Sequence, residues 1–382
     1  MKVFKFGGAS VKDADAVKNI GIILLGFGTA LVFFSLRLET FALFALVAAL
    51  YHTLNHAIFK ALLFLGAGSV VSATGTRNME EYGGLIKLLP GTSALFLVGS
   101  LAISAFPPFN GFASEWLTFQ VLFAGIASAS VVVKSVFIFA IGSLAFTGGL
   151  AAACFVKAFG STFLARPRSE HARHAHEAAW PMLLPMAVLA LLALLLGVFS
   201  TTVIASLAGI VASIGLIQPL TLQFPFMEFI ADREQFAVLP LEGFALVLLG
   251  VFAIVTAGFI IATRSRKVVI SRTWDCGTPL SPRMEITASS FSRSIVTVFR
   301  GILRPTKQTD TEYHDEDMRY FIKYQEVKTA IGDPYRKTLY GPLRAAIQMV
   351  ASRARRIQGG SVNAYLAYIF VTLMALLAWA AR

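Results

Sequence analysis

The stretch Tyr51–Gly68, YHTLNHAIFKALLFLGAG, places His52, His56 and Lys60 inside an otherwise apolar run. Residues four positions apart share one face of an α-helix, and four residues rise about 6 Å. The three ionisable side chains therefore form one stripe, which Asn55 borders. A helix in lipid rarely carries such groups unless they face a wet cavity or one another. We interpret the stripe as part of a proton pathway.

Two other interpretations of this stripe stay open. Two histidines at i and i+4 can bind a metal ion, but Thr53 stands where a zinc protease carries its general-base glutamate, and no third ligand follows. His52 and His56 can also be hydrogen-bonded packing residues. Lys60 favours the proton pathway, because burying the charge of a lysine is costly.

The composition indicates a polytopic membrane protein of the all-α class. Of 382 residues, 56% are hydrophobic and 14% are charged, and the mean hydropathy is +0.71. Soluble domains have about a quarter of their residues charged. The net charge of +12 indicates basic cytoplasmic loops rather than nucleic-acid binding, for which the sequence has no motif.

Cysteines are too few for a disulfide framework or an iron–sulfur cluster. Cys154 lies in an apolar span and Cys276 in a basic segment. We therefore expect no cofactor and no redox site in this chain.

The chain divides by composition into five segments. Residues 19–163 are expected to form proton-channel helices, 164–263 further transmembrane helices, 264–360 a basic cytoplasmic segment and 361–382 a last transmembrane helix. Residues 1–18 do not match this pattern, and MKVFKFGGASV reads as a strand before a Gly-Gly turn. Lys5, Gly7, Gly8 and Ser10 resemble the start of aspartokinases, and we interpret the leader as a fusion or a mis-joined end.

The predicted spans are Asn19–Leu36, Thr40–Ala73, Pro90–Ser128, Val131–Phe163, Pro181–Thr201, Pro240–Ala262 and Asn363–Ala381. Thr40–Ala73 is too long for one upright crossing, so part of it must be tilted or interfacial. Residues 202–239 are less regular. Within residues 264–360 the pattern predicts amphipathic helices. If Pro90–Ser128 crosses once, the chain has about seven spans. The cytoplasmic side then holds the N-terminal lysines, Thr76–Lys87, Arg166–Glu177 and the long tail.

The segment Pro107–Phe112, PPFNGF, interrupts the span Pro90–Ser128. Pro107, Pro108 and Gly111 are expected to break the helix. A broken helix at membrane depth lines a cavity or is buried in protein. Glu115 follows the break, near a helix N-terminus whose dipole favours its ionised form, and is interpreted as a protonatable gate. The alternative is an ordinary loop with Glu115 at the membrane interface.

Two further polar features have ordinary explanations beside functional ones. Lys157 lies near the end of an apolar span, where snorkelling is the default and continuation of the polar axis is the alternative. His171, His174 and His176 could bind a metal ion, but a solvated cytoplasmic loop explains them better.

Several motifs in one order resemble a known family. HTLNHAIFKALLFLGAGSV, GTRNMEEYGGLIKLLPGT and LAISAFPPFNGFASEWL are similar to the proton-conducting, antiporter-like membrane subunits of complex I (NADH:quinone oxidoreductase), Mrp antiporters and membrane-bound hydrogenases. FVKAFGSTFLARPRS and WDCGTPLSPRMEITASSF resemble hydrogenase-4 component B and formate hydrogenlyase subunit 3. The resemblance covers about residues 19–382.

The resemblance implies a function and a set of site residues. His52, His56 and Lys60 would form the central axis of the second half-channel, with Glu115 as its terminal group and Lys157 as a weaker member. The chain would be a proton-translocating subunit in the cell inner membrane, with membrane and redox subunits as partners. It would correspond to the second antiporter-like repeat, without the first.

Three rival functions stay open. They are an Mrp-type Na⁺/H⁺ antiporter subunit, a truncated membrane scaffold without transport, and an amino-acid kinase suggested by residues 1–18 alone. Composition excludes a soluble enzyme.

Overall fold

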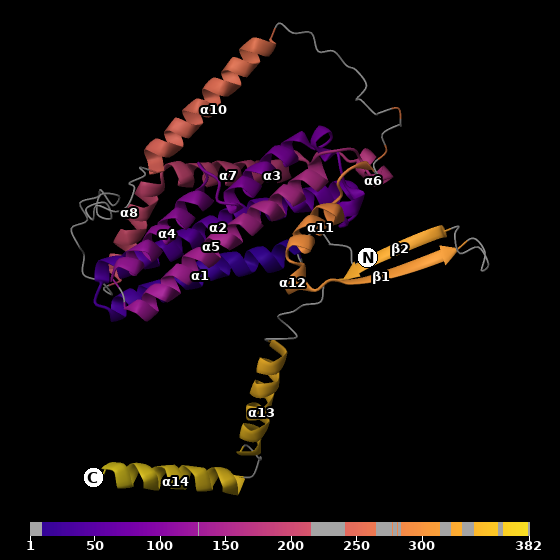
Figure 1. Ribbon diagram of the computed structural model, residues 1–382. Coiled ribbons are helices and arrows are strands. Elements are labelled where there is room, and N and C mark those ends of the chain that lie inside the picture. The colour runs from indigo at the N-terminus through magenta and orange to yellow at the C-terminus, as the bar shows by residue number, and fades with distance from the viewer. Residues whose placement is uncertain are drawn as a thin grey trace. The chain divides into compact units, whose positions relative to one another are not determined.

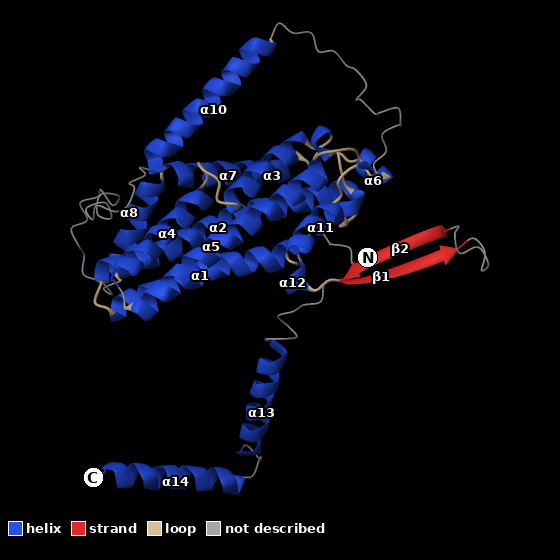
Figure 2. Ribbon diagram, viewed as in Figure 1, coloured by secondary structure: helices blue, strands red, loops and turns tan. Residues whose placement is uncertain are grey.

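The computed structural model describes residues 10–128, 130–214, 241–264, 277, 281, 284–313, 322–330, 340–357 and 362–380. Helices dominate these residues (Figures 1 and 2). The α-helices are α1 (Ser10–Ser35), α2 (Glu39–Thr74), α3 (Pro90–Ile103), α4 (Asn110–Ser128), α5 (Val131–Phe163), α6 (Glu170–Arg173), α7 (Trp180–Val198), α8 (Ser200–Ser213), α10 (Leu241–Thr263), α11 (Ala288–Val298), α12 (Arg300–Leu303), α13 (Gly341–Ile357) and α14 (Val362–Ala380). Two short 3₁₀ helices, η1 (Met79–Glu81) and η2 (Leu85–Lys87), lie between α2 and α3.

Several of these helices are long and apolar enough to cross a membrane. Among the described residues they are α2, α5, α7 and the part of α10 from Gly243 to Thr263. Shorter apolar helices are Gly21–Ser35 of α1, α3, α8 and Tyr365–Ala380 of α14. The prediction of a membrane protein built from helices is therefore confirmed. The strand expected before residue 10 lies outside the described residues.

The prediction of an all-α chain is wrong at one place. Strands β1 (Thr306–Tyr313) and β2 (Ile322–Ala330) pair antiparallel, with Thr306 opposite Ala330. The sequence pattern had predicted amphipathic helices here. Thr and Tyr occur in both strands, and β2 adds Ile322 and Val327. Such side chains favour the extended backbone over the helix.

The chain divides into two compact units, one from Val3 to Ser292 and the other from Arg293 onward. The first unit contains the helix bundle. Its helix α2 is capped by Gly75, which adopts the left-handed conformation with φ of 66°, as glycine commonly does after the last helical residue. Helix α3 begins at Pro90, where a missing N–H costs nothing.

Helices α3 and α4 both run antiparallel to α2, so the chain keeps one direction from the start of α3 to the end of α4. Along α2, His52 contacts Ser114 of α4, and further on a Cβ on Gly66 would lie 2.8 Å from the ring of Phe96 in α3. Gly99 of α3 packs between these two levels, against Leu62 and Leu63 of α2. The chain therefore does not turn back on itself between α3 and α4.

Helix α5 runs parallel to α2, with aromatic contacts at both ends. The ring centroids of Phe33 in α1 and Phe137 in α5 are 5.8 Å apart. Towards the other end, those of Phe96 in α3 and Phe163 in α5 are 5.3 Å apart. Each contact lies in its own buried apolar cluster.

The loops that follow α2 and α5 meet at the same end of the bundle. Gly83 N donates to Thr162 O at 3.2 Å, and Gly84 N donates to Leu164 O at 2.7 Å. Arg168 Nε donates to Glu80 O at 3.2 Å. The polar loop Thr76–Lys87 and the basic loop Arg166–Glu177, which were predicted to lie on one side of a membrane, are therefore in direct contact.

Tyr82 in this loop region gives a pH-dependent prediction. Its side chain is fully buried, and its hydroxyl donates to Thr76 O at 2.6 Å. Burial raises the pKa of Tyr82 to about 12 from an ordinary value of 10.0. The unfolded chain loses this proton near pH 10 while the folded chain keeps it, so stability should fall between about pH 10 and pH 12.

The Tyr82→Phe variant checks this prediction. Loss of the hydroxyl should cost about 1 kcal/mol near pH 8, because one buried hydrogen bond is lost. Between about pH 10 and 12 the thermal unfolding midpoints of the two proteins in lipid nanodiscs should converge. Midpoints that stay a constant distance apart over this range would contradict the prediction.

Glu177 gives a prediction about the start of α3. Its carboxylate accepts from Gly91 N at 2.6 Å, from Thr92 N at 3.3 Å and from Thr92 Oγ1 at 2.6 Å. It thus satisfies amide groups that have no partner within the helix. Glu177→Ala should lower the free energy of unfolding by about 1 to 2 kcal/mol. Glu170→Ala is the control, because the Glu170 carboxylate is exposed and its ion pair with Arg173 at 3.4 Å contributes little.

Candidate functional site

One face of α2 carries the predicted polar stripe into the interior of the bundle. His52 and Asn55 are fully buried, and His56 and Lys60 are half-buried. The ring of Phe59 packs edge-on against the ring of His56, with centroids 5.4 Å apart. The ammonium nitrogen of Lys60 is covered and lies 5.7 Å from the ring centroid of Phe64. Continuous helix over this whole segment therefore places all four polar groups inside protein.

His52 is connected to α4 through a serine. Its Nδ1 lies 3.0 Å from Ser114 Oγ, and that hydroxyl also lies 3.2 Å from the carbonyl oxygens of Asn110 and Gly111. A hydroxyl has one proton, and both carbonyls can only accept it. Donation to a carbonyl leaves the Ser114 oxygen to accept from His52 Nδ1–H, so this arrangement favours the tautomer that carries its proton on Nδ1.

Asn55 joins α2 to the first residue of α4 through two hydrogen bonds. Asn55 Nδ2 donates to Asn110 O at 2.9 Å, and Asn110 Nδ2 donates to Asn55 Oδ1 at 3.1 Å. Both amide side chains are fully buried. The pair holds the first residue of α4 against α2, directly after the non-helical residues 104–109.

The break between α3 and α4 occupies residues 104–109 and includes Pro107 and Pro108. Gly111 was predicted to break the helix, but it lies within the first turn of α4. Its role is close approach, because a Cβ there would overlap the carbonyl oxygen of Ala102 at the end of α3. Gly197 of α7 allows a second close approach, because its Cβ would overlap the carbonyl oxygen of Pro108.

Glu115 is buried in α4, with 6% of its surface exposed. Its Oε2 lies 4.0 Å from the position that a Cβ would take on Gly148 of α5. The expected help from a helix N-terminus is wrong, because α4 begins at Asn110 and its first turn holds no acidic residue. The effect of a helix dipole falls off within one turn. The carboxyl group is instead enclosed between α4 and α5, one residue after the Ser114 that contacts His52.

Lys157 of α5 lies apart from Glu115. Nine residues separate it from Gly148, which is about 13 Å along the helix. Eight residues separate Lys60 from His52 on the parallel helix α2, which is about 12 Å. The two lysines therefore lie at a similar level of the bundle, away from the level of His52 and Glu115.

A partner of Lys157 comes from the segment after the membrane helices. Lys157 Nζ donates to Ser292 Oγ of α11 at 2.7 Å, and Glu80 accepts from Ser289 N at 2.6 Å on the same helix. Lys157 is thus held by protein rather than extended freely to solvent.

Three of these polar residues were not predicted from the sequence. They are Asn110, Ser114 and Ser292. Asn110 and Ser114 are four positions apart on the helix of Glu115, and this spacing could have identified them. No local pattern relates Ser292 to Lys157.

The histidine-rich loop does not gather metal ligands in the structure. His174 Nε2 lies 3.8 Å from Glu170 at the exposed surface. Over the part of the chain that the structure describes, no group of three or more His, Cys, Asp or Glu side chains is placed to hold a metal ion.

These features define a polytopic membrane protein with ionisable side chains enclosed beside the break between α3 and α4. Residues 29–142 match the family described as "NADH:quinone oxidoreductase/Mrp antiporter, TM". Residues 29–142 are thus similar to the antiporter-like transmembrane domain of this family, as the motifs indicated. The matched range includes the α2 stripe, the break and Glu115.

Two relatives and one solved structure extend the similarity beyond this range. Hydrogenase-4 component B of Escherichia coli (strain K12) is 33% identical over 367 residues, which is 95% of this chain and 54% of the relative. Formate hydrogenlyase subunit 3 of the same organism is 35% identical over 293 residues, which is 76% of this chain and 45% of the relative. The chain thus spans about half the length of these curated relatives.

The fold is similar to a chain in the membrane-bound sulfane sulfur reductase, an archaeal respiratory membrane complex. The TM-score is 0.51 at 21% identity, over 95% of this chain and 55% of that chain. The comparisons give no support to the aspartokinase resemblance of residues 1–18.

Proposed function

We propose that this chain is a proton-translocating membrane subunit of a redox-driven complex of the hydrogenase-4, formate hydrogenlyase or complex I type. The proton pathway runs through His52, His56, Lys60, Glu115 and Lys157. The observation that carries this proposal is the enclosure of the α2 stripe against the broken segment, through the contact of His52 with Ser114 beside buried Glu115. Similarity to subunits of hydrogenase-4 and formate hydrogenlyase supports the assignment.

We further propose that α3, the break and α4 form one discontinuous crossing. Their uninterrupted antiparallel course along α2 supports this proposal, and so does the meeting of the loops after α2 and α5. With α1, α2, α5, α7, α10 and α14, the chain would then cross the inner membrane about seven times. The basic loops and the segment 264–360 would face the cytoplasm.

Protons would move between these side chains through bridging water. Along the bundle, Lys60 and Lys157 lie about 12 Å from the level of His52 and Glu115. This distance is too long for a proton to pass directly from one side chain to the other. His56 lies between these levels on α2 and would relay the proton. Each charge moved against the membrane potential requires about 2.3 kcal/mol per 100 mV. The driving energy must come from partner subunits, because the sequence offers no redox site of its own.

Lys60→Met tests this pathway. The complex containing the chain is reconstituted in liposomes, turnover is started, and the internal pH is followed with a trapped dye. Loss of the ammonium group should lower the proton flux per turnover by about tenfold or more, as loss of a proton-transfer group commonly does. Lys87→Met, at an exposed position of η2, is the matched control and should leave the flux unchanged. Equal flux in wild type and Lys60→Met would exclude Lys60 from the pathway.

The family match also covers Mrp antiporters, so Na⁺/H⁺ exchange is the second candidate. The same liposomes distinguish the two functions. Exchange predicts that an imposed sodium gradient drives proton flux without redox turnover. A wild-type chain that gives neither kind of flux would favour a scaffold role.

A further inference from the structure

Helix α13 combines an apolar stripe with an entirely basic set of charges. Its sequence, GPLRAAIQMVASRARRI, contains four arginines and no acidic residue. Leu343, Ile347 and Val350 follow each other at spacings of four and three, so they share one face. Their side chains are 52%, 60% and 64% exposed. A stripe of this kind is costly to leave in water.

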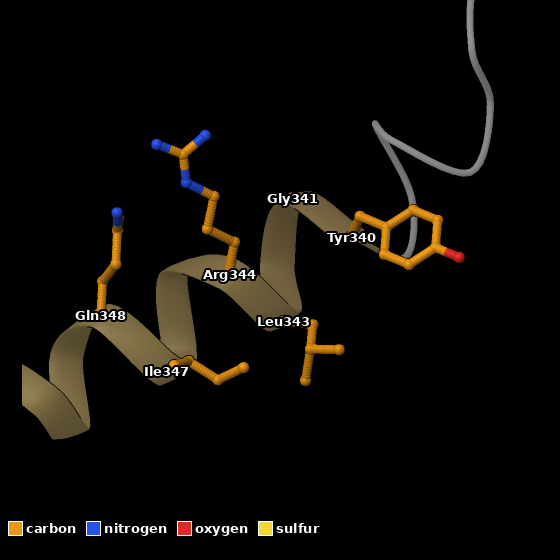
Figure 3. A pocket seen from close by; sticks show the side chains of 6 residues that line it. All are labelled: Tyr340, Gly341, Leu343, Arg344, Ile347 and Gln348. Carbon is orange, nitrogen blue, oxygen red and sulfur yellow. The ribbon is translucent and has the colours of Figure 1, made fainter.

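The arginines border this stripe on both sides. At about 100° per residue, Arg344 and Arg355 lie roughly 100° to 120° from Leu343 on one side, and Arg353 lies about 80° away on the other. Figure 3 shows Leu343 and Ile347 on one side of the helix, with Arg344 on the other. A hollow on the same helix is lined by Tyr340, Gly341, Leu343, Arg344, Ile347 and Gln348. The helix therefore presents apolar side chains and guanidinium groups next to each other.

The chain itself brings α13 close to the membrane. Only residues 358–361 separate it from α14, a mostly apolar helix of 19 residues that is about 28 Å long. That length matches the hydrocarbon core of a bilayer. Four connecting residues span at most about 17 Å. The end of α13 therefore lies within this distance of the membrane surface, given the insertion of α14 proposed above.

We propose that α13 lies in the plane of the membrane surface and binds anionic lipids. Leu343, Ile347 and Val350 enter the boundary between headgroups and acyl chains, while Arg344, Arg353 and Arg355 bind lipid phosphates. A flat anionic surface fits a stripe with cations on both borders. A second copy of α13 fits poorly, because it would bring like charges together.

Spin-label accessibility in the full chain tests this proposal. Cys154 and Cys276 are replaced with serine, and a nitroxide is attached through Ile347→Cys or through Ser352→Cys on the opposite face. In nanodiscs containing phosphatidylglycerol, the label at 347 should be reached by oxygen but not by a water-soluble nickel chelate, and the label at 352 should show the reverse. A label at 347 that the chelate reaches, or that neither reagent reaches, would overturn the proposal, since the latter indicates a protein partner.

Charge dependence provides the second measurement. Arginines near an anionic surface contribute about fivefold each to binding, so Arg344→Gln, Arg353→Gln and Arg355→Gln together should shift the docking equilibrium on the order of a hundredfold. Pure phosphatidylcholine should weaken docking similarly. The control replaces the exposed Arg293, Arg300 and Arg304 with glutamine, which removes the same charge elsewhere. Equal shifts in both triple variants would also overturn the proposal. Proton flux is not measured here, so the outcome is independent of the Lys60 test.

Discussion

Glu115→Gln is expected to abolish proton translocation while leaving the fold intact. Glutamine has nearly the shape of glutamate and keeps hydrogen-bonding capacity, but it cannot bind and release a proton. Glu115 is 6% exposed and lies beside the Ser114 that contacts His52. Removing a proton-transfer group at such a site should reduce the flux by about a hundredfold or more. The measurement is the internal pH of liposomes that contain the complex, during turnover.

Two comparisons make this result specific. Glu39→Gln removes an exposed carboxylate from the first turn of α2 and should leave the flux unchanged. Glu115→Asp keeps a titratable carboxyl group, so it should retain part of the flux, whereas a purely structural role predicts equal damage from Asp and Gln. Normal flux in Glu115→Gln would remove Glu115 from the pathway.

Gly111→Ala is expected to produce the largest loss of stability among single methyl additions. The new Cβ would overlap the carbonyl oxygen of Ala102, and backbone cannot move aside as a flexible side chain can. Overpacking in a close-packed interior costs about 1 to 3 kcal/mol, and more when backbone is involved. Separation of α3 from α4 would also disturb the Asn55–Asn110 hydrogen bonds. The midpoint temperature for loss of monodisperse protein in detergent should fall by several degrees.

Gly142→Ala is the matched control for this effect. Gly142 lies in α5, and a Cβ there meets nothing within 4 Å. Replacing a helical glycine with alanine should stabilise the protein by about 0.5 to 1 kcal/mol. A midpoint for Gly111→Ala at or above the wild-type value would show that the two helices can separate without cost.

The membrane class, the helical spans and the polar stripe on α2 could be predicted from the amino-acid sequence, because each depends on residues close together in the chain. Runs of apolar residues indicate spans, and a spacing of four residues places His52, His56 and Lys60 on one helix face. Pro107 and Pro108 likewise indicate a break through their own backbone chemistry.

The tertiary structure decided which groups meet. His52 reaches Ser114 across 62 positions, Asn55 reaches Asn110 across 55, and Lys157 reaches Ser292 across 135. Local periodicity carries no information about such pairs, because it specifies the face of a helix but not the helix that packs against it. For the same reason, the close approach at Gly111 became visible only with α3 and α4 in place. The sequence thus named the ionisable groups, and packing between distant helices placed Glu115 at the level of His52 and Lys157 beside α11.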